Sequence, residues 1–212
     1  MPADELFDIF DERMTRIGTA SRREAHAQGL WHRTFHCWIV SKSTAGQWRL
    51  LLQLRHKDKD THPGMLDISS AGHLLAGEDA EDGVRELEEE LGLLVPFEEL
   101  LYCGIVPEQT IIPGVGMDRE FNHLFVLECD KPLDQYAFQR SEISGLFFVA
   151  VDAFKALVAG ELPSMAAEGI VLDESERNLL YEDRTVSLRH ITPNSDLYYA
   201  TLFRVIDAVV GR

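Results

Sequence analysis

The sequence predicts a domain of the α/β (α+β) class, in which strands and helices follow one another in mixed order. Short apolar runs of strand length alternate with a few segments that have the spacing of amphipathic helices. Turns containing glycine, proline and other breakers separate these segments. The length of 212 residues and the hydrophobic content of 45% are ordinary for one globular core. We therefore expect a single domain over residues 1–212, with a helical C-terminal extension over residues 151–212.

The first quarter of the chain is rich in strand signals. Four apolar runs predict strands: residues 6–10, 16–20, 34–40 and 48–54. The last two runs predict a hairpin across residues 43–46. Between the pairs, Ser21 is followed three residues later by Glu24, a capping-box pattern that predicts the start of a short helix. We therefore expect a hairpin and a short helix as an N-terminal extension of the main sheet.

The second half of the chain carries further strands and two helices. Three runs predict strands: residues 101–106, 121–128 and 147–149. The glycine-rich residues 113–116 join the first two, and we take the loop from Pro107 to Arg119 as part of a pocket wall. Apolar residues at helical spacing predict helices over residues 151–158 and 194–209, and the second of these closes the fold. Residues 159–189 are left as pocket wall or dimer contact.

An acidic helix is predicted over residues 85–92. Positions three and four apart share one face of a helix. Three glutamates therefore share one edge, which we expect to be exposed: Glu86, Glu89 and Glu90. Leu87 and Leu91 fall on the opposite side and would bury the helix against a core. Gly92 supplies the left-handed conformation that ends helices.

The carboxylate edge of this helix needs a positive partner. Three crowded carboxylates repel one another, and hard divalent cations such as Mg²⁺ or Mn²⁺ take oxygen ligands. The alternative is a solvated acidic face, which is common on surface helices. Residues 67–78 favour the metal, because they predict a short strand and a loop in which Gly72 and Gly77 let the backbone approach a ligand. The sequence therefore predicts an enzyme that acts on phosphates through metal ions.

The composition limits the partners of the chain. Its formal net charge is −16, whereas nucleic-acid binding relies on lysine and arginine, so we expect no nucleic-acid partner. We see no apolar run long enough to cross a bilayer, and Pro2 to Glu5 are polar and acidic, unlike a signal peptide. We expect no membrane partner and a cytoplasmic location. The three widely spaced cysteines suit reduced, partly buried thiols.

A basic segment follows the predicted strand that ends at residue 54. Arg55 is suited to grip a phosphate through two parallel hydrogen bonds, and Lys59 is suited to act as a point charge. We therefore predict that Arg55 and Lys59 bind the phosphates of a substrate. An exposed basic loop without a ligand is the alternative.

The residues from Gly72 to Leu93 resemble the signature of the Nudix hydrolases. That signature is Gly, five residues, Glu, seven residues, then Arg-Glu-apolar-any-Glu-Glu-any-Gly-apolar. The matching residues are Gly72, Glu78, Arg85, Glu86, Leu87, Glu89, Glu90, Gly92 and Leu93. The chain departs from the signature at the junction between loop and helix, because one residue fewer separates Glu78 from Arg85.

The resemblance implies a Nudix-like α/β/α sandwich with a mixed central sheet, and a metal-dependent hydrolase that cleaves a diphosphate linked to another group. Glu86, Glu89 and Glu90 would hold Mg²⁺, with Mn²⁺ as the other candidate. Gly72 would offer a backbone carbonyl near the metal, and Arg85 would orient the carboxylates. Glu89 and Glu90 are also candidates for the catalytic base.

Hydrolases of this superfamily often recruit one more carboxylate from outside the signature. Glu120 stands at the start of a predicted strand and is our candidate for this catalytic role, as base or metal ligand. A surface ion pair with Arg119 or Arg33 is the alternative. The resemblance implies a small-molecule diphosphate substrate, whose attached group the sequence leaves open. Related proteins are often dimers, so a homodimer is also left open.

A finer resemblance, over about residues 5–150, is to the Nudix branch related to type I isopentenyl diphosphate isomerases. It rests on four segments: residues 29–35, 55–59, 62–64 and 70–73. Those isomerases place a catalytic cysteine immediately before a Gly-His pair, where this chain has Ala71. They also use a Glu-any-Glu pair, where this chain offers Glu120 but Asn122. An isomerase-like enzyme is therefore the less favoured alternative.

Two further hypotheses come from the same resemblance. His26, His32 and His73 match or nearly match positions that ligate a second metal in the isomerases, although a packed, hydrogen-bonded histidine is the commoner role. A binding module that senses a diphosphate without turning it over would be expected to have lost helix carboxylates. All three are intact here, which favours the enzyme.

Overall fold

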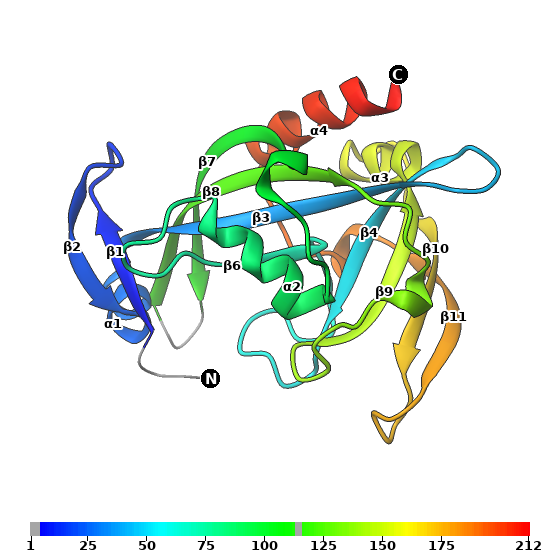
Figure 1. Ribbon diagram of the computed structural model, residues 1–212, viewed down its shortest axis with the longest axis horizontal. Helices are drawn as coiled ribbons and strands as arrows, with labels where there is room; N and C mark the ends of the chain where they lie inside the picture. The colour runs from blue at the N-terminus through cyan, green and yellow to red at the C-terminus, as the bar shows by residue number, and fades with distance from the viewer. Residues whose placement is uncertain (1–4, 113–115) are drawn as a thin grey trace.

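The structure, a computed structural model, describes residues 5–112 and 116–212 as a sheet with helices on both sides (Figure 1). Residues 113–115 of the predicted glycine-rich turn and residues 1–4 lie outside the described residues. The strands are β1 (Leu6–Phe10), β2 (Arg16–Ser21), β3 (Trp31–Lys42), β4 (Trp48–Arg55), β5 (Leu66–Asp67), β6 (Ser70–His73), β7 (Leu101–Ile112), β8 (Gly116–Glu128), β9 (Ile143–Ala150), β10 (Met165–Leu172) and β11 (Leu179–Val186). The helices are α1 (Arg22–Gln28), α2 (Arg85–Leu91), α3 (Val151–Val158) and α4 (Asp196–Val210).

The sheet is mixed, as predicted. One path through it runs in the order β11-β10-β9-β4-β3-β1-β2, and β5, β6, β7 and β8 join at the side. Strand β3 pairs with β8 in parallel, from Trp31 opposite Arg119 to Val40 opposite Glu128. It pairs with β4 and β6 in the antiparallel sense. The long strand β3 therefore joins the main path of the sheet, through β4, to the β7–β8 pair, through β8.

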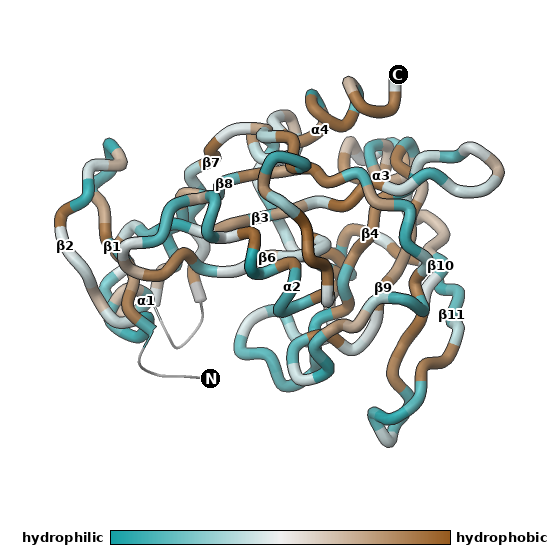
Figure 2. The backbone as a smooth tube through the Cα atoms, viewed as in Figure 1, coloured by the Kyte–Doolittle hydropathy of each residue, from teal (hydrophilic) through white to brown (hydrophobic). Residues whose placement is uncertain are grey.

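The two faces of β3 bury separate parts of the core, because successive side chains of a strand point to opposite faces. Trp38 and Val40 pack with residues of α3 and α4. Cys37 and Ile39 pack with the apolar side of α2. Figure 2 shows hydrophobic residues along the middle of β3 and hydrophilic residues in the loop between β4 and β5. The predicted α/β/α sandwich with a closing C-terminal helix is thus confirmed.

The N-terminal hairpin and helix form as the sequence predicts. Strands β1 and β2 pair antiparallel. The Ser21 hydroxyl accepts from the backbone N–H of Glu24, and the Glu24 carboxylate accepts from the backbone N–H of Ser21, which completes the capping box. Gly29 ends α1 with a φ of 63°, in the left-handed region that favours glycine.

Two predictions for later parts of the chain are wrong. The expected helical extension over residues 151–212 contains the antiparallel strands β10 and β11 between α3 and α4. Met165 to Gly169 alternate between buried and exposed, which is the period of a strand. The expected loop from Pro107 to Arg119 consists largely of the paired ends of β7 and β8, where Glu108 lies opposite Glu120.

The cysteines match the prediction of reduced thiols. Cys37 and Cys103 are buried, Cys129 is partly buried, and all three are free. Burial raises the pKa of the Cys103 thiol to about 12, so it stays protonated at neutral pH. Within residues 5–112 and 116–212, every helix is too short or too polar to cross a membrane.

Candidate active site

Helix α2 presents its three carboxylates away from the core. The apolar residues on its other side, Leu87 and Leu91, are fully buried. Gly92 ends the helix with a φ of 65°. Glu89 is exposed, but Glu86 and Glu90 are only 9% and 8% exposed. The expectation of an exposed edge is therefore wrong for Glu86 and Glu90, because strand β6 packs against that part of the helix.

Arg85 ties the start of α2 to the preceding loop. Its Nε and Nη2 donate to the two carboxylate oxygens of Glu78 over 2.9 and 3.0 Å. Its Nη1 donates to Glu86 Oε1 over 2.5 Å, and Nη2 also donates to the His73 carbonyl over 2.9 Å. The shortened connection passes through a 3₁₀ turn, Asp82–Val84, and still leaves Glu78 in contact with Arg85. Arg85 thus has the contacts that an orienting role requires.

The backbone of β6 fixes both buried carboxylates. A Cβ atom added at Gly72 would lie 2.1 Å from Glu86 Cδ, so the absence of a side chain leaves the space for that carboxylate. The neighbouring Ala71 N–H donates to Glu90 Oε2 over 3.0 Å. Glu86 and Glu90 are therefore held beside each other by two successive residues of one strand.

The two buried carboxylates lack sufficient positive charge from the protein. Burial raises the pKa of Glu90 to about 8, and the neighbouring Glu86 carboxylate adds to the effect. Burial raises the pKa of Glu86 to about 7 even though Arg85 acts in the opposite direction. A divalent cation would favour the ionised carboxylates and offset their repulsion. The all-oxygen donor set therefore fits Mg²⁺ or Mn²⁺.

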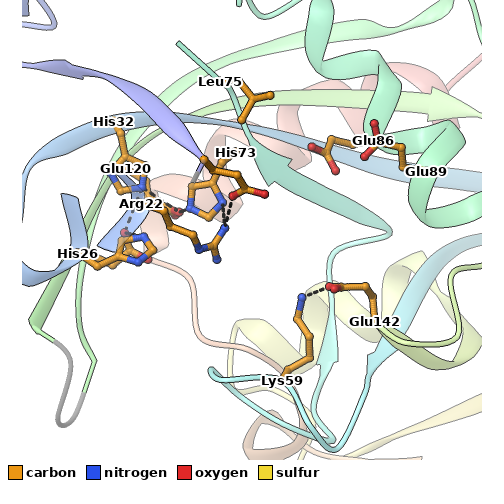
Figure 3. A network of polar contacts seen from close by, with 12 residues as sticks. Arg22, His26, His32, Lys59, His73, Leu75, Glu86, Glu89, Glu120 and Glu142 are labelled. Atoms are coloured by element: carbon orange, nitrogen blue, oxygen red, sulfur yellow. Dashed lines mark hydrogen bonds and ion pairs between the residues drawn. The ribbon is translucent and has the colours of Figure 1, made fainter. Parts of the chain in front are cut away.

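The carboxylates of α2 line a polar cavity of about 1140 Å³, part of which is shown in Figure 3. Arg55 and Lys59 line the same cavity. Arg55 Nη1 donates to Asp67 Oδ2 over 2.7 Å, and its Nε and Nη2 donate to Thr61. Lys59 forms an ion pair with Glu142 (Figure 3). A phosphate that binds these cations would have to share them with the protein's own acceptors.

A second group of potential ligands lies at this cavity (Figure 3), and we call it the histidine cluster; its members line the cavity, except the fully buried His32. Its members are His26, His32, His73, Asp118 and Glu120. His32 Nε2 lies 3.4 Å from Asp118 Oδ1 and 3.9 Å from Glu120 Oε1. His73 Nε2 lies 3.5 Å from Glu120 Oε1. One ligand atom each from His32, Asp118 and Glu120 lie within 4.8 Å of one another, close enough to share one ion.

Hydrogen bonds determine which ring nitrogen is free in two of these histidines. His32 Nδ1 lies 2.9 Å from the Leu30 carbonyl, which can only accept, so the ring proton is on Nδ1. The Nε2 lone pair of His32 then faces the carboxylates. Arg22 Nη1 donates to His73 Nδ1 over 3.1 Å, so the neutral His73 ring carries its proton on Nε2. His32 is therefore ready to ligate a cation, whereas the N–H of His73 Nε2 lies 3.5 Å from Glu120 Oε1 without forming a hydrogen bond.

The histidine cluster contains buried polar atoms that have no hydrogen-bond partner within the described residues. These atoms are Nε2 of His26, His32 and His73 and Oδ1 of Asp118. Burial lowers the pKa of His32 to about 4. Burial, together with the Asp118 carboxylate, raises the pKa of Glu120 well above its usual range. Neutral imidazole nitrogens beside the carboxylates of Asp118 and Glu120 fit a transition-metal ion with nitrogen and oxygen ligands.

Glu120 therefore belongs to the histidine cluster. Alternate residues of a strand share a face, so Asp118, Glu120 and Asn122 point to the same side of β8. The resemblance to the isomerases places a pair of acids at residues 120 and 122, where this chain has Glu120 and Asn122. A pair of acids with the same spacing is present two residues earlier, as Asp118 and Glu120. The nearest ring nitrogens to Glu120 Oε1 belong to the neutral His32 and His73, at 3.9 and 3.5 Å, in place of the expected pairing with Arg119 or Arg33.

A family model described as NUDIX domain matches residues 30–168, well over half of the chain. The chain belongs to the NUDIX domain family. This Nudix chain is 37% identical over 203 residues to an uncharacterised Nudix hydrolase of Clostridium acetobutylicum, and the match covers 96% of this chain and 97% of that protein. The family acts on pyrophosphate bonds.

Two other likenesses cover less of the Nudix chain. It is 34% identical over 124 residues to the isopentenyl-diphosphate Delta-isomerase of Serratia proteamaculans, which covers 58% of this chain and 65% of that enzyme. The crystal structure of DR0079 from Deinococcus radiodurans aligns with a TM-score of 0.53 and 23% identity, and the match covers 74% of this chain and 90% of that one. The second likeness supports the fold alone.

Sequence reasoning gave no role to several carboxylates that line the cavity, among them Glu108 and Glu142. Glu108 stands in the polar run Glu108-Gln109-Thr110 of β7, where no alternation of polar and apolar residues singles it out. Glu142 gave no signal, because only the folded chain brings it to the cavity. Its segment is held near α2 by the Gln139 N–H, which donates to the Glu90 carbonyl over 2.9 Å.

Proposed function

We propose that this Nudix protein is a hydrolase that cleaves a diphosphate linkage by attack of water, with Mg²⁺ or Mn²⁺ held by Glu86, Glu89 and Glu90. The observation that carries the proposal is the packing of the Glu86 carboxylate on Gly72, beside a Glu90 carboxylate fixed by the Ala71 N–H. Buried acids gathered in this way need a hard cation. The similarity to the clostridial Nudix hydrolase over nearly the whole chain supports the proposal.

Each residue of α2 near the cavity has its own part in the proposed reaction. A divalent cation, when bound, neutralises charge on the phosphate oxygens and lowers the pKa of a bound water. Glu86 and Glu90 are the ligands fixed by β6, and Arg85 orients Glu86 through its 2.5 Å hydrogen bond. Glu89 is exposed and takes the proton of the attacking water. The water oxygen bonds to phosphorus, and the bridging oxygen leaves with its electron pair.

We propose that the substrate phosphates bind Arg55 and Lys59, with Lys59 exchanging Glu142 for a phosphate oxygen. The backbone carbonyl of Gly72 is kept as a further proposed ligand to the metal. We treat residues 1–212 as one domain that acts in the cytoplasm on a small molecule and not on nucleic acid. A homodimer stays a prediction.

We further propose that the histidine cluster holds a transition-metal ion through His32, Asp118 and Glu120. The free Nε2 of His32 and the unpartnered Oδ1 of Asp118 support this assignment. Glu120 is thus a ligand of this second ion. Its proposed catalytic role is to place that charge beside the substrate.

An isomerase-like enzyme is the second candidate, because the acids Asp118 and Glu120 both face the histidine cluster. The similarity to the Serratia isomerase over about half of the chain also favours it. Ala71, however, stands where the isomerases carry a cysteine, and an alanine side chain can neither give nor take a proton. Incubation with isopentenyl diphosphate separates the two reactions, because isomerisation releases no phosphate. Conversion to dimethylallyl diphosphate without phosphate release would replace the hydrolase proposal.

The direct test is cleavage of a panel of diphosphates with Mg²⁺, with Mn²⁺ and with EDTA. The hydrolase proposal expects release of phosphate that EDTA abolishes. Glu89→Gln should lower kcat by at least about 100-fold, because the base and a ligand are lost. Glu88→Gln changes an exposed neighbour on the same helix and should keep the rate. Metal-dependent binding of a diphosphate without any cleavage would instead identify a sensor.

A further inference from the structure

One wall of the cavity is lined by polar residues that alternate along β3 and β7. Thr34 and His36 share a face of β3, Glu108 and Thr110 share a face of β7, and all four line the cavity. The same face of β3 becomes apolar at Trp38, which packs with α4. Hydrogen-bonding groups thus occupy a part of the sheet that would otherwise continue the core. The hydrolysis proposed above makes no use of this wall.

Buried contacts behind the wall hold its groups in place. The Thr34 hydroxyl donates to Asn122 Oδ1 over 2.7 Å, and Asn122 Nδ2 donates to Glu108 Oε2 over 3.1 Å. Glu108 Oε1 accepts from the Ser195 N–H over 2.7 Å. Thr34 and Asn122 are 2% and 0% exposed. A buried network of this kind fixes side-chain positions, so the wall is preorganised for a ligand.

His36 presents a donor on this wall. Trp38 Nε1 donates to the Tyr198 hydroxyl over 3.0 Å, and that hydroxyl lies 2.9 Å from His36 Nδ1. An indole N–H can only donate, so the Tyr198 hydroxyl accepts from it. The hydroxyl can then donate its own hydrogen to His36 Nδ1. Burial lowers the pKa of His36 to about 4, which keeps the ring neutral. The one ring proton is then on Nε2, where the ring offers it as a donor.

The rest of the cavity is unsuited to large apolar groups. Within residues 5–112 and 116–212 its lining has no phenylalanine, tyrosine or tryptophan, and its few apolar side chains are Ile68, Ala71, Leu75 and Pro193. A prenyl chain needs an apolar wall, and a nucleobase is usually held on an aromatic face. An additional phosphate on this wall would be repelled by the carboxylates of Glu108 and Asp67. Arg55 would not offset this repulsion, because it already pairs with Asp67.

We propose that the group attached to the diphosphate is polyhydroxylated, as in a sugar, and that its hydroxyls bind Thr34, His36 and Glu108. A hydroxyl both donates and accepts, so it matches an N–H donor, a carboxylate acceptor and a threonine hydroxyl placed on one wall. Asn194 lines the same cavity and adds an amide. The inference rests on the proposed hydrolase function and names its substrate class.

Four probes with the same terminal phosphoanhydride test the inference: glucose 1-diphosphate, ribose 5-diphosphate, isopentenyl diphosphate and uridine diphosphate. In each, the water oxygen bonds to the terminal phosphorus and the bridging P–O bond breaks, which gives phosphate and a monophosphate. We expect kcat/KM for one of the two sugar probes to exceed that for isopentenyl diphosphate at least tenfold. The kcat/KM for uridine diphosphate should not exceed that for ribose 5-diphosphate, because the two compounds differ only by the base.

The failures of this test are distinguishable. Cleavage that EDTA abolishes but that prefers isopentenyl diphosphate, or prefers uridine diphosphate to ribose 5-diphosphate tenfold, overturns the sugar inference and leaves the hydrolase standing. Absence of cleavage for all four probes overturns the sugar inference, and it overturns the hydrolase as well where the wider diphosphate panel is also left uncleaved.

Variants of the wall supply an independent readout. Thr34→Val should lower the ratio of kcat/KM between the preferred sugar probe and isopentenyl diphosphate at least tenfold, and Thr34→Ser, which keeps the hydroxyl, should restore it. Asn194→Ala alters a partly exposed residue and should lower the same ratio without disturbing the buried network. An unchanged ratio in Asn194→Ala and in a folded Thr34→Val overturns the inference. Thermal unfolding verifies that the variants are folded.

Discussion

Replacing Gly72 by alanine would test the packing that holds Glu86. The new Cβ atom would lie 2.1 Å from Glu86 Cδ and 2.3 and 2.4 Å from its two carboxylate oxygens. Unbonded carbon atoms keep about 3.5 Å apart, so the carboxylate would have to retreat by roughly 1.4 Å. Metal ligands tolerate only about 0.2 Å. Since a misplacement of about 1 Å costs about 100-fold in rate, Gly72→Ala should lower kcat/KM of metal-dependent phosphate release by about that factor or more.

Gly18→Ala is the matched control, because its new Cβ atom would meet only Ile9, at 3.8 Å. Both variants would be assayed for phosphate release over a Mg²⁺ titration and for thermal unfolding. Overpacking costs about 1 to 3 kcal/mol, so Gly72→Ala should unfold at a lower temperature than Gly18→Ala and stay folded in the assay. Equal rates and equal Mg²⁺ dependence in the two variants would refute the packing argument.

Three further predictions concern the α2 carboxylates and the histidine cluster. In the metal-free protein, the folded-state pKa values of Glu86 and Glu90 lie at about 7 and about 8, above the ordinary 4.5, so the folded state binds more protons in this window. Its unfolding temperature should therefore fall as pH rises from 4.5 to 8, and a pH-independent value would contradict the burial described. Glu90→Gln should raise the metal-free unfolding temperature at pH 8, because an uncompensated charge is lost, yet lower turnover by at least about 100-fold; a lower unfolding temperature would contradict this. His32→Ala should lose about one equivalent of zinc or manganese by elemental analysis, whereas His62→Ala, outside the cluster, should retain it; equal metal contents would remove the second site.

The acidic helix could be predicted from the sequence because its signals are local. The spacing of Glu86, Glu89 and Glu90 and the glycine at residue 92 are all read within one short segment. The burial of Glu86 and Glu90 could not be predicted from the sequence, because it depends on the packing of β6 against α2. Nothing in the helix itself indicates that Gly72 would supply the space for a carboxylate.

The histidine cluster was also predicted only in part from the sequence. His32 and His73 could be picked from the resemblance, but their acidic partners depend on the parallel pairing of β3 with β8, which places His32 opposite Glu120. Parallel strands lie far apart in sequence, so no local pattern gives their register. The strands β10 and β11 were missed for a different reason, because a short alternating run near an expected helix was not weighed as a strand.

Three successive residues of β6 contact the α2 carboxylates or belong to the histidine cluster. The Ala71 N–H holds Glu90, Gly72 makes room for Glu86, and His73 belongs to the histidine cluster. A displacement of this short strand at one group is therefore transmitted to the other. In the proposed enzyme, an ion that moves β6 when it binds at one group would change the affinity of the other group for its ion, and this effect would be reciprocal. If both groups hold ions as proposed, a substitution at any of residues 71–73 is therefore expected to affect both of them.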